Sequence, residues 1–434
     1  MQRRTFIEST LFGTGYAGLR ALATGLPASW FLRPLPALAD ESQAAEGVDP
    51  GKAQYLILST SSAGDPVNAN VPGSYAFPDI AHAPDPSMAP TPIQLGTGSH
   101  LGAQIWSTLP PWVLERTCFF HHATLTNNHP NLPKVMRLMG ATAKQEMFPS
   151  LFAKSLAPAW KTVQAEPISV GAGAILTYEG RGLPNLPPTG LRDVLTKPDG
   201  ALLRLQELRD RHLDRMYALI KRDGTKAQAA YLDRLALSRA QARSLSDDLL
   251  DSLSAITSDR GEGPIQAAAT LIRMNVAPVL AVRIDMGGDN HTDEGLAREV
   301  TQHGTGVGLI SKLMETLKGF GLEDRVTFAM MNVFGRTLKK LGTAGRDHWA
   351  SHNAAVLIGK AFRPGVIGGL EPKSGDYGAT GIASATGRGD GATDIPFDDT
   401  LGALGKTLGA ALGLPRSTVD AQIGQGKVVD GALA

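Results

Sequence analysis

Short uninterrupted apolar runs alternate with longer amphipathic stretches along this chain. The runs have the length of buried strands, and they lie at residues 54–60, 117–121, 168–170, 279–284, 325–331 and 354–358. Helical spacing of apolar residues is found at residues 100–109, 133–157, 264–275, 296–320 and 401–412. Strands that alternate with helices are typical of a mainly parallel sheet with helices on both faces. The pattern therefore predicts an α/β fold.

Two further segments depart from this alternation. Residues 202–253 are charged and periodic, with a break near Gly224, and predict an α-helical insertion at about residues 200–255. The glycine-rich residues 365–391 show no periodicity, which predicts a long loop, either a surface flap or the rim of a cleft.

Composition limits the class of protein without defining it. The 434 residues carry a net charge of +1, which implies no sequence-independent attraction to nucleic acid. Cys118 is the sole cysteine, so an intramolecular disulfide is excluded. A chain of this length can bury one large α/β core with insertions, or two domains; we expect a single domain over residues 40–434.

The amino terminus has the pattern of an export signal. Arg3 and Arg4 precede a weakly apolar stretch over residues 11–39, which ends in Ala-Leu-Ala before Asp40. That stretch is too interrupted by glycine and proline for a stable membrane span. A basic start leading into an ordinary helix is the alternative, and the prolines argue against it. We expect residues 1–39 to be a twin-arginine signal peptide, the twin-arginine translocase to be a partner during export, and the mature protein to be periplasmic or otherwise exported, without a membrane span.

Aspartate and histidine gather where predicted strands end or begin. Residues 283–291 follow one apolar run and residues 346–352 precede another, while Asp65 follows the first strand. Carboxylates and neutral imidazoles are N/O donors for a divalent cation. The predicted ligands of one or two ions of zinc, calcium or manganese are Asp65, Asp289, His291, Asp347 and His348. The alternative is that these are polar loop residues that cap strands.

The predicted strand ends should converge on one site. We expect Asp65, His291 and His348 to lie within about one coordination sphere, with His129 and His352 as the next candidate members. The catalytic residue stays unassigned. A serine near Asp65, Ser61 or Ser62, could attack a substrate, or these hydroxyls could only shape a turn.

Five motifs resemble the exported family called domain of unknown function 1501, which is related to the sulfatase and alkaline-phosphatase superfamily. Its Gly-Gly-Asn-Asp-Gly-Leu-Asn, Ser-His, Gly-Trp-Asp-Thr-His, Glu-Phe-Gly-Arg-Thr and Gly-Thr-Asp-His-Gly elements are similar to residues 63–68, 128–129, 288–291, 333–337 and 345–349. The resemblance spans the leader and most of the mature chain. It implies an alkaline-phosphatase-like α/β fold.

Two positions depart from the family pattern. Val333 replaces an acidic residue, which removes a possible metal ligand or base, and Trp349 replaces a glycine, which is expected to crowd the site.

The resemblance and the strand-end clusters together favour an exported metal-dependent hydrolase of a phosphate or sulfate ester. Asn68 and Arg336 would orient the anionic substrate, because the planar guanidinium matches tetrahedral oxyanions; His129 and His352 are further candidate substrate-binding residues. The alternative is a catalytically inactive exported protein of the same fold that binds a glycan, a cell-surface polymer or a partner protein. The expected ligand is accordingly an anionic small molecule or a polysaccharide.

The leader can be tested directly. Replacing both Arg3→Lys and Arg4→Lys should leave unprocessed precursor in the cytoplasm, because the paired guanidinium groups are the recognition element of the pathway. Immunoblotting of cell fractions measures this. A double variant that still appears outside, cleaved after residue 39, would show that the leader uses the general secretory route instead.

Overall fold

The computed structural model describes residues 48–171, 175–195, 247–340 and 344–434, and between 195 and 247 residues 212, 214–225, 229 and 232–233. The predicted signal peptide and most of the predicted insertion at residues 200–255 lie outside the described residues. Within that insertion, residues 214–223 are helical. No helix among the described residues is long and apolar enough to cross a membrane.

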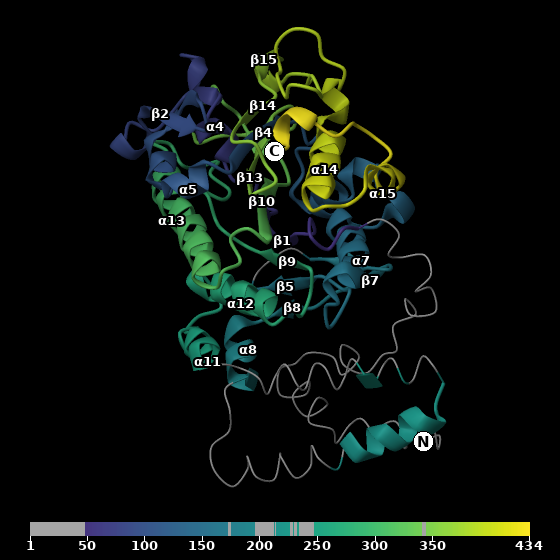
Figure 1. Ribbon diagram of the computed structural model, residues 1–434. Helices are drawn as coiled ribbons and strands as arrows, with labels where there is room; N and C mark the ends of the chain where they lie inside the picture. The colour runs from purple at the N-terminus through teal and green to yellow at the C-terminus, as the bar shows by residue number, and fades with distance from the viewer. Residues whose placement is uncertain are drawn as a thin grey trace.

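A large sheet forms the centre of the molecule (Figure 1). Its strand order is β14-β4-β13-β10-β1-β9-β5-β8. The strands are β1 (Tyr55–Ser61), β4 (Thr117–His122), β5 (Ile168–Val170), β8 (Asn185–Leu186), β9 (Val279–Val282), β10 (Val326–Asn332), β13 (Asn353–Ile358) and β14 (Gly365–Ile367). Every residue of β1, β10 and β13 is buried, as expected for strands covered on both faces. The predicted α/β class with a mostly parallel sheet is confirmed.

One strand runs against the others. β13 pairs antiparallel with both β10 and β4, whereas the remaining pairs in the sheet are parallel. In its described residues, 333–340 and 344–352, the connection from β10 to β13 contains no crossover helix; it holds the short hairpin of β11 (Gly335–Arg336) and β12 (His348–Trp349). Because a parallel neighbour requires a crossover, β13 has to return in the opposite direction. Its first residue therefore lies at the same edge as the carboxyl ends of the parallel strands.

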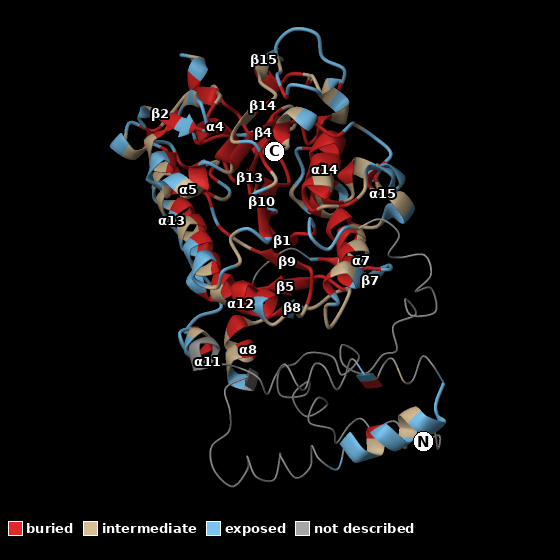
Figure 2. Ribbon diagram, viewed as in Figure 1, coloured by how far each residue is buried: buried red, intermediate tan, exposed pale blue. Residues whose placement is uncertain are grey.

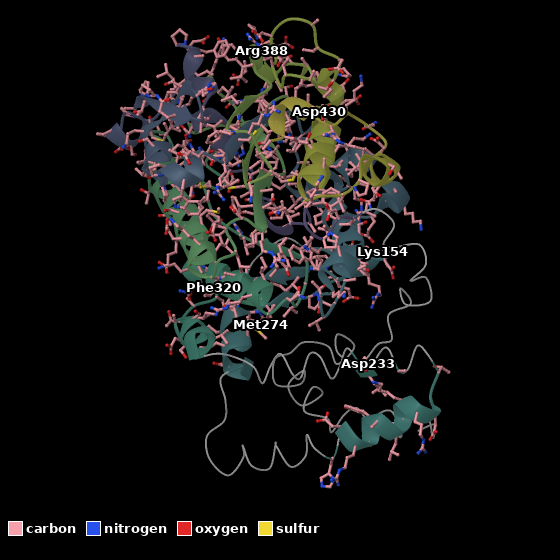
Figure 3. All side chains as sticks on the ribbon, in the orientation of Figure 1. Lys154, Asp233, Met274, Phe320, Arg388 and Asp430 are labelled. Atoms are coloured by element: carbon pink, nitrogen blue, oxygen red, sulfur yellow. The ribbon has the colours of Figure 1, made fainter. Side chains whose placement is uncertain are left out.

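Helices cover both faces of the sheet (Figure 1). On one side lie α12 (Glu262–Arg273) and α13 (Ala297–Gly319), and on the other lie α7 (Phe148–Trp160), α14 (Thr400–Ala411) and α15 (Arg416–Gln422). Figure 2 shows the strands almost wholly buried and the exposed positions on the outward sides of these helices. Figure 3 labels Met274 and Phe320, where α12 and α13 end at the amino edge of the sheet, and the Arg273 guanidinium lies 4.6 Å from the Phe320 ring centroid.

Two elements predicted from the sequence are wrong, because the pattern of apolar residues does not reveal the tight turns of two hairpins. Residues 100–109 are not a helix: β3 (Gly98–Ala103) pairs antiparallel with β2 (Pro90–Leu95), and a short 3-10 helix follows. Residues 365–391 are not one long loop, since they contain β14 and the hairpin of β15 (Leu370–Lys373) and β16 (Asp376–Ala379). Ser374 and Gly375 turn this hairpin with φ of 51° and 85°, the left-handed pair that a two-residue turn requires.

The predicted helix at residues 133–157 is two helices. α6 (Leu132–Met136) ends before a left-handed stretch at Leu138, Met139 and Gly140, and α7 begins at Phe148. A helix cannot continue through successive residues of positive φ.

A buried ion pair ties the loops at the carboxyl edge to α13. Arg346 donates from Nε to Glu299 Oε2 at 2.9 Å and from Nη2 to Glu299 Oε1 at 3.2 Å, and both side chains are fully buried. Glu299 also accepts from Asn70 Nδ2 at 2.6 Å and from Asn290 Nδ2 at 2.8 Å. Four hydrogen bonds thus compensate the carboxylate for its loss of water.

Removing the charge of Glu299 should therefore be costly. Glu299→Gln leaves the Arg346 guanidinium buried without its counter-charge, and we expect the free energy of unfolding to fall by about 3–5 kcal/mol. Urea denaturation followed by circular dichroism measures the change. Glu262→Gln is the matched control, because Glu262 is exposed and its contact with Lys312 is 3.7 Å long, so less than about 1 kcal/mol is expected. A similar small effect at both positions would contradict the structural role of the buried pair.

Candidate metal centre

Four strands place their polar ends at one edge of the sheet. Ser61, the last residue of β1, is paired with Asn332, the last of β10, and Asn353, the first of β13, is paired with His122, the last of β4. The loop that follows β9 begins near the same edge, because Val282, the last residue of β9, is paired with Ser59 of β1. The ligand-bearing loops of this chain therefore meet there, as they do at the carboxyl edge of other open α/β sheets.

Four side chains at this edge converge on one space. They are His129, Asp289, His291 and His348, each of which offers one ligand atom within 4.8 Å of all the others. His291 Nε2 lies 2.8 Å from His348 Nε2 and 3.6 Å from an oxygen of Asp289, and His129 Nε2 lies 3.8 Å from the other oxygen of Asp289. These spacings are close to those between ligands of a single ion, so a possible metal-binding cluster exists here.

The hydrogen bonds of the three imidazoles fix which nitrogen faces that space. His129 Nδ1 lies 2.7 Å from Ser62 O and His348 Nδ1 lies 2.6 Å from Asn127 O. His291 Nδ1 lies 3.1 Å from a carboxylate oxygen of Asp347. Because these oxygens only accept, each Nδ1 carries the proton, and in the neutral ring each Nε2 presents a lone pair. This is the arrangement in which protein histidines bind metal.

The contact between His291 and His348 has a further consequence. With both Nδ1 atoms protonated, the two neutral rings face each other through lone pairs at 2.8 Å, and neither can donate to the other. A shared cation or an additional proton would make this contact favourable. Burial, together with Arg336 and the neighbouring histidines, lowers the pKa of His348, which disfavours the additional proton.

Phe334 and Arg336 shape the floor of the cluster. The buried Phe334 ring stacks on His348 with centroids 4.2 Å apart and meets His129 edge-on at 4.9 Å. Arg336 Nη2 donates to Asp289 Oδ1 at 3.1 Å. Partial burial opposes ionisation of Asp289, but the Arg336 guanidinium and the interactions with His291, whose backbone N–H faces the carboxylate, outweigh it and lower the pKa of that carboxyl. Asp289 is thereby kept ionised, which is the form in which a carboxylate could bind a cation.

Arg336 itself is not available to a substrate. Its side chain is fully buried, and it donates to Gly64 O, Ala63 O and Arg346 O at 2.6, 2.6 and 3.2 Å. Four of its five N–H groups are used within the protein. The expectation that Arg336 orients an anionic substrate therefore needs correction: it holds the loop after β1 and positions Asp289.

Asp347 and Trp349 lie differently from what the sequence suggested. Asp347 is outside the four-residue cluster and instead accepts from His291, with its side chain 77% exposed. Trp349 does not crowd the site, because in β12 it alternates with His348 and points to the other face. Its indole N–H donates to Tyr377 O at 2.5 Å.

Asp65 is buried away from the cluster. Its carboxylate accepts from Ser61 Oγ at 3.0 Å and from the Met286 N–H at 3.3 Å. Burial raises its pKa to about 6, opposed by these hydrogen bonds. Asp65 thus fastens the loop after β9 to β1, and the expected meeting of Asp65 with His291 and His348 is not seen in the structure.

Asn68 and His352 belong to a buried chain of hydrogen bonds. His121 Nε2 donates to Pro72 O at 2.9 Å, so its Nδ1 accepts from His352 Nε2 at 2.8 Å, and His352 Nδ1 accepts from Asn68 Nδ2 at 3.3 Å. Burial lowers the pKa of His121 to about 4 and that of His352 well below its usual value. The two histidines are therefore neutral. Asn68 and His352 are also fully buried, so the direct substrate contact that was expected for them does not fit this structure.

The two loops that carry most of the ligands touch through a glycine. Gly345 donates its N–H to His291 O at 2.7 Å, and a Cβ at this position would lie 1.6 Å from Asn290 O. A side chain would force the loops apart, and His291 and His348 with them.

The donor set discriminates among the metals expected from sequence. Three imidazole nitrogens and one carboxylate suit zinc or another borderline transition ion, whereas calcium takes oxygen ligands almost exclusively. From the sequence, His129 was expected as a further member of the metal site or as a substrate-binding residue, and the structure places it with Asp289, His291 and His348. Its position shortly after β4, at the same edge as His291, was the available signal.

Residues 188–383 match the model of the family described as "Protein of unknown function (DUF1501)". This span includes Asp289, His291, Arg336 and His348 and supports the resemblance to that family. A comparison with curated proteins finds no match.

Loss of one imidazole should remove the metal. Protein purified without chelator should carry about one equivalent of a transition ion, and His291→Ala should reduce this strongly, because a cation loses one of four ligands. Elemental analysis of the folded proteins measures the content. His212→Ala, at an exposed histidine outside the cluster, should keep the full equivalent. Equal metal content in both variants would place any bound ion elsewhere.

Proposed function

We propose that this protein is an exported metal-dependent hydrolase of a phosphate or sulfate ester, with the fold of the sulfatase and alkaline-phosphatase superfamily. The observation that carries the proposal is the convergence of three Nε2 lone pairs with the Asp289 carboxylate. The ester class is supported by the resemblance to the family and by the position of the site at the carboxyl edge of the sheet. The twin-arginine leader predicted from the sequence would make the periplasm the compartment of the mature protein.

The residues of the chain have separable roles in such a site. His129, Asp289, His291 and His348 would hold the cation, and Asp347 would orient the ring of His291. A divalent cation bound here would polarise an ester oxygen and favour ionisation of water near neutral pH. Arg336 keeps Asp289 ionised and in place.

The hydroxyl groups near the site differ in their freedom to act. Thr60 is buried, and Ser61 Oγ donates to Asp65 while it accepts from the Ala63 N–H at 3.1 Å. Ser62 is exposed, and its carbonyl holds His129. Water and Ser62 are therefore the two candidate nucleophiles.

A catalytically inactive exported protein of the same fold is the second candidate. Two observations favour it. Arg336 and Ser61 both use their polar groups in hydrogen bonds within the protein, and the buried, apolar Val333 stands where the family has an acidic residue. Such a protein would hold the metal and bind a glycan, a surface polymer or a partner protein without turnover.

Turnover separates the two candidates. The zinc- or manganese-loaded protein should hydrolyse at least one of 4-nitrophenyl sulfate, bis(4-nitrophenyl) phosphate and 4-nitrophenyl phosphate, and His348→Ala should fall to background because it lacks a ligand. Release of nitrophenol measures the rate, with His212→Ala as the control that retains activity. A loaded, folded protein that turns over none of the three would favour the inactive binder.

A further inference from the structure

The charge around the cluster is small once a divalent cation is counted. The Asp289 carboxylate accepts from Arg336 Nη2 at 3.1 Å, and Asp347 contributes a second carboxylate that accepts from His291. These two negative charges offset the two charges of a bound cation. The Arg336 guanidinium, 3.1 Å from Asp289, then leaves the site with a single net positive charge.

Cations on the adjoining loops are committed to other partners. Arg346 is fully buried with Glu299, and Arg283 pairs with Asp285 at 2.6 Å. Lys339 pairs with Asp79 at 2.8 Å, and the Lys340 ammonium donates to Glu294 O. None of these four side chains is therefore a free guanidinium that could bind two oxygens of a substrate at the cluster.

A second metal ion has no comparable set of ligands in the described part of the chain. Among the described residues, His129, Asp289, His291 and His348 form the one group of histidines and acids whose spacing could hold an ion. Asp65, the nearest candidate for a second site by sequence, is fully buried and hydrogen-bonded to Ser61 and Met286. A single divalent ion brings two positive charges to a site, whereas the pair of ions in a two-metal site brings four.

We infer that the site selects a singly charged tetrahedral ester, a sulfate monoester or a phosphate diester, over a doubly charged phosphate monoester. The inference rests on the proposed function and adds the charge of the substrate to it. A phosphate monoester carries close to two negative charges above pH 7, since its second pKa is near 6. One excess positive charge and a buried, committed Arg336 match one negative charge and leave the second without a partner.

The test uses the zinc-loaded full-length mature protein at pH 8 with three chromogenic esters. We expect kcat/KM for 4-nitrophenyl sulfate or for bis(4-nitrophenyl) phosphate to exceed that for 4-nitrophenyl phosphate at least about tenfold. The first two probes distinguish a sulfate monoester from a phosphate diester as the substrate. Equal or faster turnover of 4-nitrophenyl phosphate would overturn the inference while supporting hydrolysis.

Binding keeps the inference testable if no ester is hydrolysed. Failure of all three substrates would reject the hydrolase. Isothermal titration of the same loaded protein with phenyl sulfate and phenyl phosphate would then decide the charge preference. Tighter binding of phenyl sulfate supports the inference, whereas tighter binding of phenyl phosphate, or binding of neither, overturns it.

A charge variant provides a second readout. Asp347→Asn removes one negative charge at the rim, so the ratio of phosphate-monoester to sulfate-ester turnover, or of their affinities, should rise about three- to fivefold. Using the ratio cancels any general loss from reorientation of His291. Asp324→Asn is the control, because Asp324 precedes β10 at the opposite edge of the sheet, and the ratio should not change. An unchanged ratio in Asp347→Asn would contradict the electrostatic basis of the selection.

Discussion

The carboxylate of Glu299 is the constraint on which the site depends. It binds Arg346, next to Asp347 and His348, and Asn290, which lies between Asp289 and His291. Its bond to Asn70 adds the segment after β1. A buried ion pair contributes little net stability compared with apolar packing, because desolvation offsets most of the Coulombic attraction. Here it fixes the relative position of the two ligand loops, and α13 supplies the rigid support.

The hydrogen bonds around the cluster give the site its chemical character. Each imidazole donates Nδ1–H to an oxygen from a different segment: Ser62, Asn127 or Asp347. The tautomers and the ring directions are therefore set before any ion binds, which lowers the entropic cost of assembling the ligands. Asp289 is similarly prepared by Arg336. This pre-organisation would favour a cation that takes nitrogen ligands.

Sequence periodicity was sufficient for most of the sheet, because strands buried on both faces are continuous apolar runs, as in β1, β9 and β10. It could not give the reversed direction of β13, which depends on the lack of a crossover helix. Proximity to a strand end pointed to Asp289, His291 and His348, which the structure brings together, but it could not separate the members of this cluster from the residues that support them. Asp65 and Asp347 have the right chemistry in the sequence, yet hydrogen bonds that exist only in the folded chain commit one to Ser61 and Met286 and the other to His291.

X-ray absorption at the zinc edge tests the metal centre most directly. For the zinc-loaded mature protein, the spectrum should fit three imidazole nitrogens and one carboxylate oxygen, at about 2.0–2.2 Å, with any further ligand being oxygen. Replacing His129→Ala should lower the imidazole contribution from three to two. A coordination shell without imidazole, or one that His129→Ala leaves unchanged, would contradict the site described here.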